Sequence, residues 1–142
     1  MDIVKSANAE WSGNIKEGKG RIVTESGALD SAYGFNTRFA GEKGTNPEEL
    51  IGAAHAGCFS MAFANKLSTE GFTVESIKTE AKVHLGKVGD AFKVTKIELS
   101  TQATVPSIDN DKFQTIAEDA KINCPISQAL KSVEIVFTAT LN

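Results

Sequence analysis

The fold of this chain is organised around one segment, 46-NPEELIGAAHAGCFSMAFA-64. Asn46 is a good N-cap and Pro47 suits the first position of a helix, so the sequence predicts a helix that begins here. We expect it to run to about residues 67–68 and to end at Gly71. Its sides carry small or apolar residues and almost no charge. This pattern predicts a long central helix that is buried on all sides.

Three runs before this segment, separated by turns that contain glycine, predict a small antiparallel meander. In the third run, Phe35 and Phe39 fall on one face of a strand and Arg38 falls on the other. Arg38 is therefore expected to project away from the two rings. The three runs cover residues 9–12, 20–26 and 33–40.

The residues after the segment alternate in a way that predicts two long strands with one buried face each. Apolar residues keep odd positions from Ile77 to Leu85 and again from Ile97 to Val105. Phe92 is even, so the second strand needs a bulge or a bend near residues 95–96. Three elements follow: an amphipathic helix over 111–122 with Asp109 as a possible cap, a short helix that opens at Cys124-Pro125 and ends at about Leu130, and a strand over 134–141. The order of strands, helix, strands, helix and strand is an α+β arrangement.

The composition excludes several classes of protein. With 142 residues, 41% of them hydrophobic and 23% charged, the chain is expected to form a single domain, 1–142. A net charge of -3 with scattered Lys and Arg provides no basic stripe, so nucleic acid is not an expected partner. The N-terminus has no export pattern, and the weakly polar stretch 50–64 is too short to cross a bilayer. We predict a cytoplasmic protein with no membrane partner.

The two cysteines, Cys58 and Cys124, are the first candidates for chemistry. In a reducing compartment a pair of cysteines is more often catalytic, metal-binding or inert than a structural disulfide. Two unrelated buried thiols are the plain alternative, because free cysteine is among the most buried residue types. A zinc site made with His55 and His84 is disfavoured, because no Cys-x-x-Cys or paired-His spacing is present. We predict neither a metal ion nor a cofactor.

A reactive Cys58 needs a cation or a helix dipole to lower its pKa. Arg38 is the better candidate, since a guanidinium keeps its charge when it is buried. His55 lies on the same helix as Cys58 but, in apolar surroundings, is more often a hydrogen-bonded core residue. Glu48 and Glu49 occupy the first helical turn, where the dipole stabilises carboxylates. Glu49, at the third helical position, could act in capping, which leaves Glu48 to hold an arginine.

The chain contains the motifs 44-GTNPEEL-50, 53-AAHAGCFS-60 and 123-NCPISQ-128. These three motifs strongly resemble the OsmC proteins of the OsmC/Ohr family of thiol-dependent hydroperoxide reductases. The run around Arg38 and the strand of Trp11 match as well, so the resemblance covers essentially the whole chain.

This resemblance implies an OsmC-like fold, an intertwined homodimer with antiparallel sheets around two buried central helices, and active sites at the interface. It implies that Cys58 is the peroxidatic thiol, Cys124 the resolving thiol, and Arg38 with Glu48 the pair that activates Cys58. The reaction is then reduction of organic hydroperoxides to alcohols, and more weakly of hydrogen peroxide. It proceeds through a sulfenic acid and a Cys58–Cys124 disulfide that an external dithiol, either a small molecule or a lipoylated protein, reduces.

Two questions stay open at this point. The apolar neighbours of Cys58, such as Phe39, Phe59 and Met61, suit organic hydroperoxides or simply fill the core. On a straight helix Glu48 and Cys58 lie about 15 Å apart, so their coupling needs a bend or an arginine that links the two ends. A different class of function also competes: a redox-responsive binding protein whose disulfide switches its shape without turnover.

Overall fold

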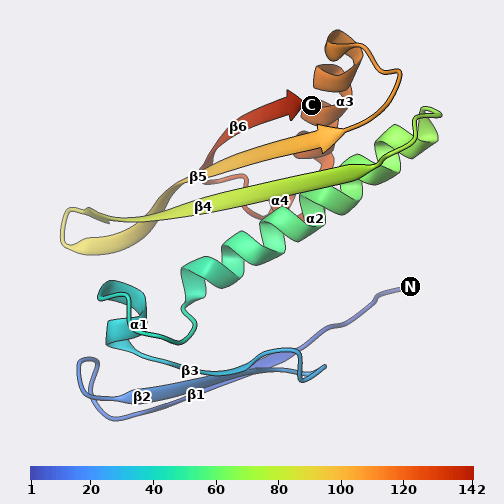
Figure 1. Ribbon diagram of the computed structural model, residues 1–142. Coiled ribbons are helices and arrows are strands. Elements are labelled where there is room, and N and C mark those ends of the chain that lie inside the picture. The colour runs from blue at the N-terminus through green and yellow to red at the C-terminus, as the bar shows by residue number, and fades with distance from the viewer. The chain divides into compact units, whose positions relative to one another are not determined.

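The elements follow the predicted α+β order in the computed structural model, which describes all 142 residues (Figure 1). The chain divides into two units, Met1–Leu50 and Ile51–Asn142. Each unit has a three-stranded sheet of its own. No helix is long and apolar enough to cross a membrane.

The first unit is built on the antiparallel meander β1 (Ala7–Ser12), β2 (Lys19–Thr24) and β3 (Asp30–Tyr33), in that spatial order. The predicted meander is thus confirmed. Trp11 and Tyr33 both pair with Gly20 across the sheet, and their ring centroids are 5.6 Å apart. A Cβ at Gly20 would lie 2.3 Å from the Tyr33 ring, so only glycine fits there.

The prediction that the third strand continues to residue 40 is wrong, because residues Phe35–Phe39 form the short helix α1. The Gly34 N–H donates to Thr37 Oγ1 at 2.9 Å, and the Thr37 hydroxyl donates to the Gly34 carbonyl at 3.0 Å, which closes a turn. The Phe35 and Phe39 rings lie 4.8 Å apart. A spacing of four places two residues on one face of a helix as well as on one face of a strand, so the sequence pattern could not separate the two.

Helix α2 (Pro47–Thr69) begins and ends close to the predicted residues. The Glu49 N–H donates to Asn46 Oδ1 at 2.8 Å, which confirms the predicted cap. At the other end, Gly71 has φ 87° and the Phe72 N–H donates to the Leu67 carbonyl at 3.0 Å. This is the left-handed closure for which glycine is favoured.

Within a single chain α2 is buried on one side only, so its burial on all sides stays a prediction. One stripe is buried: Gly52, His55, Phe59, Phe63 and Leu67. The opposite side is exposed, and Met61 on that side is 77% exposed. One side of α2 packs on the sheet of the second unit. The small residues on the opposite side of the helix have no partner within the chain.

The sheet of the second unit has the order β4 (Ser76–Val88), β5 (Ala91–Thr104) and β6 (Glu134–Leu141). Strands β4 and β5 are antiparallel, and their register moves from His84 opposite Lys96 to Leu85 opposite Val94. The residue between these partners, position 95, is therefore the extra one, which confirms the predicted bulge.

Strand β6 runs parallel to β5, so the expectation of purely antiparallel sheets is wrong here. The chain between them forms α3 (Asn110–Asn123) and α4 (Pro125–Ala129). A connection of this length returns the chain to the end where β5 began, and the next strand then pairs in parallel. The Lys112 N–H donates to Asp109 Oδ1 at 2.9 Å, which confirms the predicted cap of α3.

The core of the second unit lies among α2, α3 and the sheet. The ring centroid of Phe59 is 5.2 Å from that of Phe137 on β6, and Phe63 is 5.3 Å from Phe113 on α3. Cys124 is fully buried in the same cluster, and Cys58 packs against its edge. The core therefore fixes the helices that carry the two thiols.

Candidate functional site

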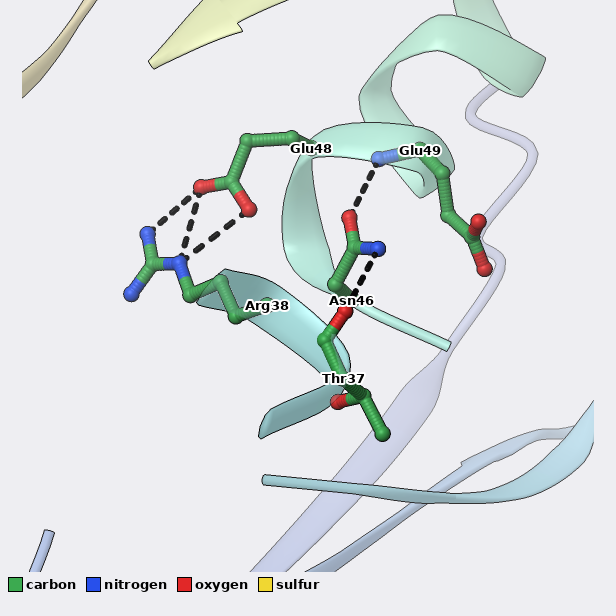
Figure 2. A network of polar contacts seen from close by, with 5 residues as sticks. All are labelled: Thr37, Arg38, Asn46, Glu48 and Glu49. Atoms are coloured by element: carbon green, nitrogen blue, oxygen red, sulfur yellow. Dashed lines mark hydrogen bonds and ion pairs between the residues drawn. The ribbon is translucent and has the colours of Figure 1, made fainter. Parts of the chain in front are cut away.

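An ion pair joins Arg38 on α1 to Glu48 in the first turn of α2 (Figure 2). Arg38 Nε lies 3.1 Å from both oxygens of Glu48, and Nη2 lies 2.5 Å from Oε1. This is a fork arrangement, which fixes the plane of the guanidinium as well as its position. Glu48 is 12% exposed and Arg38 is 36% exposed, so the carboxylate is the more sheltered partner.

Asn46 holds the two helices of this ion pair together. Its Oδ1 accepts the Glu49 N–H, and its Nδ2 donates to the Thr37 carbonyl at 3.3 Å (Figure 2). The residue thus ties the last turn of α1 to the first turn of α2. The ion pair forms with Glu48, as expected from the sequence, but Arg38 lies on a helix where a strand was predicted.

A pocket of about 260 Å³ lies beside Arg38 in the first unit. Its walls are mainly aromatic or aliphatic, and Arg38 is the charged side chain that lines it. The Arg38 Cζ is 5.5 Å from the centroid of the Phe39 ring, within cation–π range. Such a pocket suits an organic group attached to a hydrogen-bond acceptor. The other lining residues are Trp11, Ile15, Tyr33, Gly34, Phe35 and Pro47.

A larger depression, about 650 Å³, lies on the same unit. Its lining is rich in charged side chains of both signs, including Lys19, Glu42 and Lys43, and none of the predicted site residues contributes to it. It therefore offers less to a peroxide than the smaller aromatic pocket.

The two thiols meet within the second unit. Cys58 is half-buried on α2, and Cys124 is buried at the N-cap of α4, with Pro125 at the first helical position as predicted. Both are free cysteines, and the Cys124 side chain is close enough to Cys58 to raise the pKa of its thiol. The structure thus brings together two residues that are 66 positions apart in the sequence (124 minus 58).

The surroundings of Cys58 raise the pKa of its thiol. Burial contributes most to the rise, and the Cys124 side chain adds to it. The backbone N–H of Ile126 acts in the opposite direction, because it donates to the sulfur and favours the thiolate. No cation is among the groups of the second unit that act on this sulfur.

His55 is not placed to act as a base that takes the proton of the Cys58 thiol. It is fully buried, and its Nε2 lies 2.8 Å from Ser127 Oγ. Burial also lowers the pKa of His55, which keeps the imidazole neutral. This confirms the prediction of a hydrogen-bonded core histidine. His84, the other histidine, pairs with Glu98 at 3.0 Å, and no group of three or more His, Cys, Asp or Glu side chains is placed to hold a metal ion.

The apolar neighbours proposed for the substrate fall into different places. Phe59 is a core residue with no exposed surface, and Met61 is largely exposed. Phe39 lines the aromatic pocket. The sequence reasoning assigned no role to Ser127 or to the Ile126 N–H, although both lie in the quoted motif 123–128. The one local signal was the spacing of three between Cys124 and Ser127, which matches that between His55 and Cys58.

Comparison with known proteins agrees with the motif resemblance. A family model described as OsmC-like protein matches residues 40–138. Peroxiredoxin OsmC of Escherichia coli strain K12 is 56% identical over 133 residues, which cover 93% of each chain. An organic hydroperoxide resistance protein of Xanthomonas axonopodis pv. citri strain 306 is 30% identical over 84% of this chain and 85% of that relative. The crystal structure of OhrB of Bacillus subtilis matches with a TM-score of 0.70 and 26% identity, covering 96% of this chain and 98% of that one.

Proposed function

This chain belongs to the OsmC family, and we propose that it is a cysteine-based peroxidase that reduces organic hydroperoxides to alcohols. The observation that carries the proposal is the contact between Cys58 and Cys124, a half-exposed thiol backed by a buried one. A half-exposed sulfur can be reached by a small oxidant, and a buried neighbouring thiol can then form a disulfide with the oxidised sulfur.

In the first step, the Cys58 thiolate attacks the terminal oxygen of the hydroperoxide. The O–O bond breaks, the alkoxide takes up a proton and leaves as the alcohol, and Cys58 becomes a sulfenic acid. Arg38 acts here by lowering the pKa of Cys58 and by donating to the peroxide oxygens. Glu48 fixes the guanidinium through Nε and one N–H of Nη2, so both N–H groups of Nη1 and the second N–H of Nη2 remain for these contacts.

In the second step, the Cys124 sulfur attacks the sulfenic acid of Cys58. The S–S bond forms, the S–O bond breaks, and the oxygen leaves as water. An external dithiol, either a small molecule or a lipoylated protein, then reduces the disulfide by exchange and is itself oxidised. A dithiol must be replenished, so we assign the protein to the cytoplasm, where reducing power is supplied.

The aromatic pocket beside Arg38 favours organic hydroperoxides over hydrogen peroxide. Its apolar walls can bury the organic group, and Arg38 at its edge can receive the oxygens. Each buried methylene contributes about 0.8 kcal/mol, a gain that hydrogen peroxide cannot obtain. Two of the relatives are named organic hydroperoxide resistance proteins, which agrees with a substrate of this class.

We also propose that the protein works as a homodimer. The exposed side of α2 carries Ala54, Gly57 and Met61, which are small or apolar and have no intrachain partner on that side. A second copy would cover this surface and bring an Arg38–Glu48 pair to each Cys58. This arrangement removes the need for direct contact along α2 between Glu48 and Cys58.

The test is consumption of cumene hydroperoxide by the purified protein in the presence of a dithiol, with Cys58→Ser as its matched control. We expect repeated turnover by the natural protein and none above background by the variant. Equal rates for the two would exclude the peroxidase. A single oxidation to the disulfide, with no recycling by any dithiol, would favour the alternative of a redox-responsive binding protein.

A further inference from the structure

A buried hydrogen bond links the two helices that carry the thiols. His55 Nε2 on α2 lies 2.8 Å from Ser127 Oγ on α4, and the two residues are 0% and 5% exposed. The mechanism proposed above uses neither residue. Each is nevertheless one helical turn from a thiol, which connects this hydrogen bond to the reaction.

The two contacts between α2 and α4 form a matched pair. His55 and Cys58 are three residues apart on α2, so they lie on the same side of the helix. Cys124 and Ser127 are also three residues apart, across the turn in which the Gln128 N–H donates to the Cys124 carbonyl at 2.9 Å. His55 meets Ser127 and Cys58 meets Cys124. Two contacts one turn apart fix the rotation of α4 about its axis as well as its distance from α2.

Helix α4 depends on such contacts for its position. It has five residues, far fewer than an isolated helix needs to be stable. Its placement must therefore come from packing and from side-chain hydrogen bonds. A hydrogen bond weakens steeply when its geometry is poor, so the bond to His55 selects a single orientation of the turn that carries Cys124.

The cost of burying His55 argues for a directional role. Its Nδ1 is buried and has no hydrogen-bond partner. Burial lowers the pKa of this histidine, so the ring is neutral and offers one nitrogen to Ser127 while the other stays unsatisfied. An aliphatic side chain would fill the same space without that penalty, but it would hold no particular rotation of α4.

We propose that His55 and Ser127 are a positioning pair that keeps Cys124 aligned with Cys58 for the second step. In that step the Cys58 sulfenic acid and the Cys124 thiol form the disulfide and release water. The alignment sets how fast the sulfenic acid is resolved, and therefore how often a second peroxide converts it to the sulfinic acid. This inference rests on the proposed peroxidase function and assigns a determinant of its resolving step.

The experiment measures the two steps separately. The first is the loss of the Cys58 thiol after one equivalent of cumene hydroperoxide, and the second is the appearance of the disulfide, with sulfinic Cys58 counted by mass spectrometry. For Ser127→Ala we expect disulfide formation to slow about tenfold, because small displacements of a reacting group carry large kinetic costs. The first step should change less than the second, because the sulfur that attacks the peroxide lies on α2 and α4 affects it only through the Ile126 N–H and the Cys124 side chain.

Substitutions at His55 separate geometry from general damage to the core. The amide of His55→Gln reaches the place of Nε2, whereas the shorter amide of His55→Asn occupies the place of Nδ1. We expect the Gln variant to keep most of the resolving rate and the Asn variant to lose it. Ser127→Thr, which keeps the hydroxyl, should rescue the rate relative to Ser127→Ala.

Ser60→Ala is the matched control. Ser60 is also on α2, two residues from Cys58, and its hydroxyl donates at 2.8 Å to Thr79 on β4, away from α4. It should leave the resolving step unchanged.

Equal resolving rates for the Gln and Asn variants, or for Ser127→Ala and the natural protein, would overturn the positioning role. So would a loss in Ser60→Ala as large as that in Ser127→Ala. If Ser127→Ala does not fold, the comparison of the two His55 variants with Ser127→Thr decides the question. A natural protein that consumes no peroxide in the first step would instead overturn the proposed function, so the two failures are distinguishable.

Discussion

Removing the side chain of Asn46 should loosen the junction between α1 and α2 by an amount that can be worked out from two hydrogen bonds. In Asn46→Ala, the Glu49 N–H loses its cap, which costs about 1 kcal/mol. The Thr37 carbonyl loses a donor at 3.3 Å, a long bond whose net contribution is about 0.5 kcal/mol. We expect a loss of about 1.5 kcal/mol in the free energy of unfolding of the first unit.

Urea unfolding followed by tryptophan fluorescence measures this loss, since Trp11 is the one tryptophan and lies in the first unit. With a urea slope near 2 kcal/mol/M, the midpoint should fall by about 0.7 M. Asn46→Asp is the control, because it keeps the cap acceptor and adds a charge that the helix dipole favours. It should lose less than about 0.5 kcal/mol. An equal loss in both variants would refute the assignment of most of the energy to the cap.

Three further predictions concern the site. In Arg38→Ala, the titration of the Cys58 thiolate, followed by ultraviolet absorbance, should move to higher pH; an unchanged titration would remove Arg38 from the mechanism. In Cys124→Ser, each chain should consume one peroxide and then over-oxidise at Cys58 under repeated doses, and intact-mass spectra without sulfinic or sulfonic product would contradict the resolving role. The third prediction is a pH dependence: because burial lowers the pKa of His55 below its usual 6.5, the neutral ring stabilises the fold fully above that value, and this contribution is lost as the pH falls through the lower pKa of the folded state. Chemical unfolding between pH 8 and pH 5 should show this loss in the natural protein and a smaller one in His55→Gln, and equal slopes for the two would refute it.

The features that could be predicted from the sequence are those set by local chemistry. Asn46 and Pro47 determine the start of α2 because capping involves residues only three positions apart. The bulge at position 95 was visible because the apolar residues of β5 change parity there. Asp109 and Pro125 marked two further helix starts in the same way.

The features that were missed depend on partners distant in the sequence. Phe35 and Phe39 fit a helix and a strand equally well, and the turn closed by Thr37 decided for the helix. The parallel pairing of β6 with β5 depends on the end of the sheet to which the α3–α4 connection returns the chain. The small residues of α2 indicated burial, but a small apolar side chain does not show whether its cover comes from the same chain or from a second copy.

The candidate site also has features that the sequence predicted and features that it could not predict. Residue types alone made Cys58 and Cys124 candidates for redox chemistry and Arg38 a candidate cation. Their roles were implied by the motif resemblance and stay predictions. The contact between the two thiols could not be derived from the sequence, because it is created by the packing of α4 against α2. Ser127 carried no chemical signal apart from its spacing from Cys124.

In the proposed mechanism, each of the two units contributes one half of the electrostatics. In the second unit, burial and Cys124 raise the pKa of Cys58, which keeps the resting thiol protonated. In the first unit, Glu48 engages Nε and Nη2 of Arg38, so it fixes the guanidinium but also offsets part of its charge. An arginine has five N–H donors, and this fork leaves both donors of Nη1 for other acceptors. A peroxide whose organic group fills the aromatic pocket beside Arg38 can place its oxygens against Nη1. In the proposed mechanism, a guanidinium brought to the Cys58 thiolate would attract it more strongly where substrate excludes water, because a lower local dielectric strengthens the attraction between the two charges.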